Sequence, residues 1–94
     1  MQSALKADPS DPGAHNVLGS LYLRKGDLEK AVREFQEVIR LRPQMASAHY
    51  NLGLAFRKQN RENDAVIEFR RALAVDPQFR PAREALGRLA NSPN

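Results

Sequence analysis

Two histidines, His15 and His49, are the side chains of this 94-residue chain best suited to bind a metal or transfer a proton. A zinc ion takes imidazole nitrogens at about 2.0 to 2.1 Å and normally needs at least three protein ligands. The sequence has no cysteine and no third histidine. Equivalent positions on neighbouring packed helices also lie about 10 Å apart. We therefore expect no metal site, with each imidazole packed in a seam between helices.

The hydroxyl and carboxylate side chains give no catalytic pattern either. Asp64 and Glu68 are four residues apart, and we interpret them as a solvated acidic patch facing Arg71 rather than as an acid–base pair. A Gly-rich loop that could cradle a phosphate is missing. No motif links a histidine to any of the serines, which are Ser3, Ser10, Ser20, Ser47 and Ser92. The sequence predicts neither an enzyme nor a cofactor site.

The charge of the chain is basic but spread out. Fifteen Lys and Arg against eleven Asp and Glu give a net charge of +4. Many charges have an opposite partner four positions away, such as Glu29 with Arg33. This pattern indicates solvated outer faces rather than a nucleic-acid site. No stretch approaches the roughly 20 apolar residues that span a bilayer, so membrane insertion is not expected. The sequence leaves the compartment open and slightly favours the cytoplasm.

The elements that position these residues repeat with a period of 34. Residues 12–45 and 46–79 are two copies of one unit, a spacing typical of stacked helical arrays. We expect residues 1–11 to be the tail of a preceding unit and 80–94 to be a half repeat or capping helix, within one domain over 1–94. The residues that recur in register are Ala14 and Ala48, His15 and His49, Leu18 and Leu52, Gly19 and Gly53, Ala31 and Ala65, Phe35 and Phe69, and Pro43 and Pro77.

Local signals predict where the helices begin and end. The first helix should run from Pro12 to Lys25, with Asp11 as its N-cap and Gly26 as a left-handed stop. Asp27 should cap the next helix, and Pro43 should prevent its continuation. In the second copy, Asn60 tolerates the left-handed stop, but Arg61 is a poor cap for the helix from about Glu62. A fifth helix is expected over 80–91. The predicted buried stripe of the first helix is Ala14, Val17, Leu18, Leu21 and Tyr22.

Glycine inside a helix costs about 1 kcal/mol relative to alanine. Gly19 and Gly53 therefore predict points where a neighbouring helix comes too close for a side chain. Ala31 and Ala65 are the expected opposing residues.

At these positions the chain resembles the tetratricopeptide repeat family, through HNVLGSLYLRKGDLEKAVREFQEVIRLRP and HYNLGLAFRKQNRENDAVIEFRRALAVDP. The resemblance implies an all-α fold, a right-handed superhelical solenoid of antiparallel helix-turn-helix repeats. It also implies a protein–protein interaction module. The residues matching the repeat pattern include Gly19, Tyr22, Ala31, Phe35 and Pro43, then Gly53, Phe56, Ala65, Phe69 and Pro77.

In that family the first helix of each repeat lines a concave groove. Leu23, Tyr50 and Leu54 fall outside the predicted buried stripes, so we expect an exposed apolar floor there. With the basic margin around it, such a groove suits a protein or peptide partner with acidic residues. The resemblance maps the groove onto Asn16, Ser20, Leu23, Arg24, Tyr50, Leu54, Arg57, Lys58, Glu84 and Arg88.

A second function remains open. Helices that end a repeat array have a neighbour on one side only. Contacts between the two terminal half-repeats would make the chain a self-assembling scaffold, built head to tail as a homo-oligomer.

Overall fold

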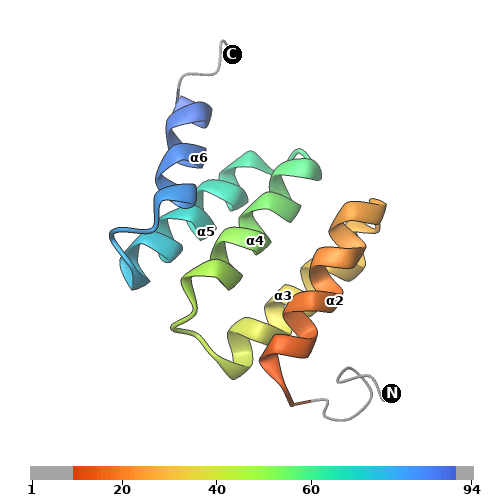
Figure 1. Ribbon diagram of the computed structural model, residues 1–94. Coiled ribbons are helices and arrows are strands. Elements are labelled where there is room, and N and C mark those ends of the chain that lie inside the picture. Colours follow the sequence, from red (N-terminus) through yellow and green to blue (C-terminus); the bar gives the residue numbers. More distant parts are fainter. Residues whose placement is uncertain (1–9, 91–94) are drawn as a thin grey trace.

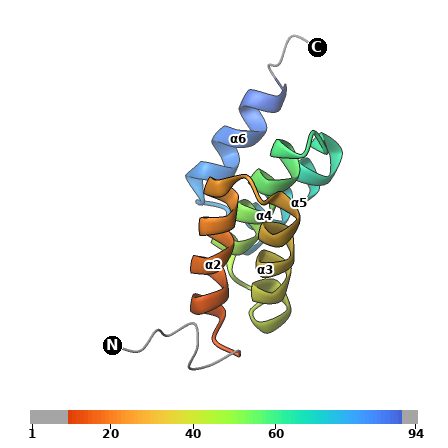
Figure 2. The same cartoon turned by 90° about the vertical axis from the view of Figure 1, so that its right-hand side faces the viewer.

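The computed structural model describes residues 10–90, which fold into five helices with no strand among them. They are α2 (Pro12–Lys25), α3 (Leu28–Leu41), α4 (Ala46–Lys58), α5 (Glu62–Val75) and α6 (Arg80–Ala90). Consecutive helices pack as antiparallel neighbours, α2 against α3 and α4 against α5 (Figures 1 and 2). The predicted all-α solenoid is confirmed. Most of the expected preceding unit, residues 1–9, lies outside the described residues.

The helix ends follow the local signals with one exception. Asp11 Oδ1 accepts a hydrogen bond of 2.9 Å from the backbone nitrogen of Gly13, as an N-cap should. Gly26 and Asn60 both take left-handed conformations, with φ of 88° and 64°. Asp27 occupies the N-cap position of α3, as predicted, but its side chain makes no capping hydrogen bond. Only its backbone carbonyl serves the helix, accepting from Ala31 at 3.0 Å.

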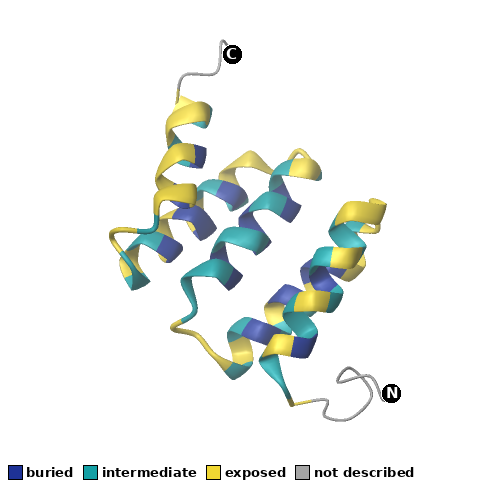
Figure 3. Cartoon of the chain, in the orientation of Figure 1, coloured by how far each residue is buried: buried dark blue, intermediate teal, exposed yellow. Residues whose placement is uncertain are grey.

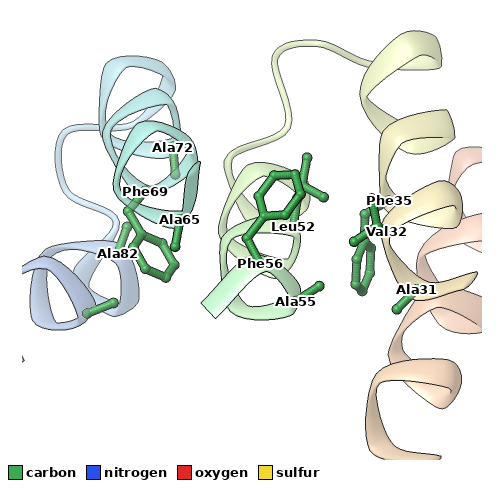
Figure 4. Close-up of a cluster of buried hydrophobic side chains, with 11 residues drawn as sticks. Ala31, Val32, Phe35, Leu52, Ala55, Phe56, Ala65, Phe69, Ala72 and Ala82 are labelled. Atoms are coloured by element: carbon green, nitrogen blue, oxygen red, sulfur yellow. The ribbon is translucent and has the colours of Figure 1, made fainter. Parts of the chain in front are cut away.

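The core consists of phenylalanines packed among alanines. Phe35 and Phe69 are fully buried, one in each helix pair. Figure 4 shows the side chains of α4 facing those of α3 on one side and of α5 on the other. Ala31 and Ala65 are also fully buried and let the helices approach closely. The buried residues thus form a seam through the helix pairs, while yellow, exposed residues cover the outer turns (Figure 3).

The residues that oppose the in-helix glycines differ from the expectation. A Cβ added to Gly19 would lie 2.7 Å from Phe35 Cε1, and one added to Gly53 would lie 2.6 Å from Phe69 Cε1. Both distances are far below van der Waals contact. The glycines therefore make room for the phenylalanine rings rather than for Ala31 and Ala65. Each phenylalanine ring needs the space that a missing Cβ leaves on the neighbouring helix. The alanines on the same helix face allow the two helices to come close but do not require a glycine opposite them.

The predicted buried stripe of α2 is also partly wrong. Val17 and Leu21 are 54% and 43% exposed. On α4 the position equivalent to Leu21 is Ala55, which is fully buried because α3 packs against α4. Helix α2 packs against α3 and α4, and no other described helix covers its remaining side. These two side chains consequently leave apolar surface at this end of the described array.

Candidate functional site

The predicted groove residues come from α2, α4 and α6. Helices α2 and α4 are in contact, and Asn51 Nδ2 donates a hydrogen bond of 3.2 Å to Asn16 Oδ1 between them. This bond links the two helices directly. Helix α6 packs on α5, and its groove residues Glu84 and Arg88 are exposed. The structure thus joins Asn16, one of the predicted groove residues, to α4, whereas α6 packs on α5.

The residues predicted to form the groove floor are less exposed than the sequence indicated. Tyr50 and Leu54 are half-buried and pack against the core, so the expectation that they are exposed is wrong. The Tyr50 ring lies with its centroid 5.7 Å from that of Phe69 and 5.6 Å from that of Phe79. Leu23 is likewise half-buried against the core. Each of the three side chains therefore packs partly against the core and remains partly exposed.

Cations border this floor at one end of the helices. Arg24 lies in the last turn of α2, and Arg57 and Lys58 lie in the last turn of α4. Arg24 and Lys58 are exposed, whereas Arg57 is half-buried, as is Ser20 one turn earlier on α2. Within residues 10–90 none of these three cations takes part in an ion pair. Their charge is available to a bound partner.

The histidines lie in the helix seams, as predicted. His49 Nδ1 is 2.9 Å from Glu68 Oε1, and its Nε2 donates to the Pro43 carbonyl oxygen at 3.0 Å. Glu68 also accepts from Arg71 and is only 6% exposed, so its interpretation as a solvated acid is wrong. Because a carbonyl oxygen only accepts, Nε2 is the donor in the bond to Pro43.

The same pair recurs one repeat earlier, where His15 Nδ1 lies 2.6 Å from Glu34 Oε1. The spacing of 19 residues between His and Glu in both units was the sequence signal for this pairing.

Among the described residues no group of three or more His, Cys, Asp or Glu is placed to hold a metal ion. On the outer side of α3, hydrogen bonding to the Arg40 guanidinium lowers the pKa of Glu37. No helix in the described part is long and apolar enough to cross a membrane.

The repeat register is matched by a family model. The model described as tetratricopeptide repeat matches residues 1–46 and 18–79. The chain therefore belongs to the tetratricopeptide repeat family, whose fold serves protein–protein interaction and is generally non-catalytic. No curated protein matches the chain.

Solved structures give the same fold. YrrB, described as a TPR protein with an unusual peptide-binding site, superposes with a TM-score of 0.86 at 24% identity, over 89% of this chain and 43% of its own. MamA gives 0.76 at 25%, over 85% and 51%. The N-terminal domain of stress-induced protein-1 from C. elegans gives 0.76 at 23%, over 86% and 69%. The chain spans about half, or less, of the first two proteins.

Proposed function

We propose that this chain is a non-catalytic adaptor that binds a peptide segment of another protein in the groove formed by α2, α4 and α6. The observation that carries the proposal is the half-buried apolar floor of Leu23, Tyr50 and Leu54 beside cations that have no partner in residues 10–90. YrrB, with the same fold, is described as having a peptide-binding site. The groove suits an extended or helical peptide with a few apolar anchors.

The charge at the groove margin selects the chemistry of the peptide. Arg24, Arg57 and Lys58 would place positive charge beside the apolar anchors, so acidic residues in the peptide favour binding and faster association. The family also contains clamps that grip a terminal carboxylate with Lys, Asn, Asn, Lys and Arg. The matching positions here are Asn16, Ser20, Asn51, Pro81 and Ala85, of which Asn51 alone agrees. A carboxylate would therefore be bound through Arg57, Lys58 or Arg88 instead.

The test is selection from a displayed peptide library, followed by calorimetry of the selected peptides. The double variant Tyr50→Ala, Leu54→Ala should weaken binding by about 2 kcal/mol or more, the loss expected for central interface anchors. Ile67→Ala is the matched control, because Ile67 is a large apolar residue, 47% exposed, on α5 outside the groove. Equal binding by the double variant and the control would refute the groove.

The salt dependence of binding distinguishes a nucleic-acid partner from a peptide partner. Binding to a phosphate backbone falls steeply with salt concentration because counterions are released. Binding anchored on Tyr50 and Leu54 should change much less between low and high salt.

One observation favours a second function, the self-assembling scaffold. Val17 and Leu21 leave apolar surface on the N-terminal side of α2. A second copy docked there through its C-terminal half-repeat would cover it. Light scattering should then show a molar mass that rises with concentration, and Leu21→Glu should abolish the rise. A monomer over a hundredfold concentration range would exclude this function.

A further inference from the structure

Leu23, Tyr50 and Leu54 form an apolar diagonal across the adjacent helices α2 and α4. These helices run in the same direction and are joined by a hydrogen bond (Figure 1). Tyr50 lies in the first half of α4, Leu54 one turn later, and Leu23 in the last turn of α2. In the repeat register Leu23 is equivalent to Arg57, seven residues beyond Tyr50. The diagonal therefore covers about 10 Å along the helices and about 10 Å across them, or roughly 14 Å in all.

The two sides of the apolar diagonal differ in charge. On one side lie Asn16 and Ser20, earlier on α2 than Leu23, and the Asn16 amide is hydrogen-bonded to α4. On the other side lie Arg57 and Lys58, in the last turn of α4. These two cations form no ion pair within residues 10–90, and neither α2 nor α4 contains an acidic residue. One flank is thus polar and neutral, and the other is cationic.

A helix complements two different flanks better than an extended peptide does. The side chains of an extended peptide point toward the surface or away from it, and backbone N–H and C=O groups occupy both of its edges. A helix instead presents an apolar stripe with side chains of its own on either side of that stripe. About three turns of helix cover roughly 14 Å.

We propose that this face binds an amphipathic helix of a partner protein that carries acidic side chains along one flank of its apolar stripe and uncharged ones along the other. The inference rests on the proposed function, since it specifies the segment that the groove binds. The apolar stripe packs on the apolar diagonal, and the carboxylates form charge-assisted hydrogen bonds with Arg57 and Lys58. The uncharged flank lies beside Asn16 and Ser20.

Three synthetic peptides test the charge of the flank. All carry the same apolar stripe and are held helical by a crosslink on the opposite face. The first has glutamates along one flank, the second has the same glutamates along the other flank, and the third has glutamines in their place. In calorimetry at low salt, each glutamate peptide should bind the chain at least tenfold more tightly than the glutamine peptide.

The direction of binding tests the asymmetry of the two flanks. Moving the glutamates to the other flank brings them beside Arg57 only if the helix is turned end to end. A nitroxide on the N-terminus of each peptide should therefore broaden amide resonances of the ¹⁵N-labelled chain at opposite ends of the apolar diagonal. One glutamate peptide should affect the amides around Leu23, and the other those around Tyr50.

Matched variants of the chain identify the cations. Arg57→Met should reduce the advantage of glutamate over glutamine severalfold, whereas Arg70→Met, at an exposed position of α5, should leave it unchanged. Equal affinity for the glutamate and glutamine peptides, or one direction of binding for both glutamate peptides, would overturn the inference and leave the groove intact. Library-selected peptides that need Tyr50 and Leu54 but bind in an extended conformation would also overturn it. If no peptide needs Tyr50 and Leu54, the proposed function itself fails.

Discussion

Replacing Gly53 by alanine adds a methyl group where a ring already lies. The added Cβ would be 2.6, 2.8 and 3.1 Å from Cε1, Cδ1 and Cζ of Phe69. The ring has little room to move, since Phe69 is fully buried and its centroid is 5.7 Å from that of Tyr50. The collision must therefore be relieved by shifting α5 relative to α4.

The size of the effect follows from two opposing terms. Overpacking of a well-packed core costs about 1 to 3 kcal/mol. Alanine in place of glycine within a helix returns about 1 kcal/mol. Gly87→Ala carries the second term alone, because an added Cβ there meets nothing within 4 Å. The free energy of unfolding of Gly53→Ala should thus be about 1 to 3 kcal/mol below that of Gly87→Ala.

Urea unfolding followed by circular dichroism measures the difference. The two variants carry the same substitution at positions that are equivalent in the repeat, so the comparison isolates the ring. Replacing Phe69 by leucine in the Gly53→Ala background should reduce the penalty of the added methyl group. A Gly53→Ala variant at least as stable as Gly87→Ala would refute the packing argument.

Three further predictions concern single contacts. Asp11→Ala should lower the free energy of unfolding by about 1 kcal/mol through loss of the α2 cap, whereas Asp27→Ala should change it much less; equal losses in thermal unfolding would contradict the assigned caps. His49→Leu should lower the free energy of unfolding by about 3 kcal/mol, because the buried Glu68 loses its hydrogen bond to His49. The double variant His49→Leu, Glu68→Leu should lower it by less than the sum of the two single changes. Additive losses in a double-mutant cycle would show that the pair is not coupled. Arg40→Gln should raise the pKa of Glu37 toward its ordinary value. Because the folded-state pKa is lowered, the pair stabilises the fold above the unfolded-state pKa of Glu37, and this stabilisation is lost as the pH falls through the folded-state value. An unchanged ¹³C titration of the Glu37 carboxyl group would contradict this pairing.

The helix ends were predictable because their signals are local. Gly26 and Asn60 adopt the left-handed stop between consecutive helices, and Asp11 caps α2 through a residue two positions away. The 34-residue period likewise fixed which helices pair. These features depend on neighbours in the sequence rather than on the contacts made after folding.

Contacts between helices were harder to predict. The sequence indicated alanines opposite the glycines, but the Phe69 ring lies against Gly53 instead. The sequence places Tyr50 outside the buried stripe of its helix and therefore predicts it on the surface. In the structure Phe79, in the loop before α6, packs against the Tyr50 ring. The burial of Glu68 followed from its pairing with His49, a partner 19 residues away. Each case depends on side-chain orientation across two elements.

The groove on α2 and α4 is the central claim, and calorimetry of a library-selected peptide tests it most directly. The titration would compare the chain with the Tyr50→Ala, Leu54→Ala variant and with the Ile67→Ala control. Our account predicts that the control binds like the unchanged chain and that the double variant loses at least about 2 kcal/mol of binding free energy while its helical circular dichroism is retained. Unchanged binding by the folded double variant would contradict it.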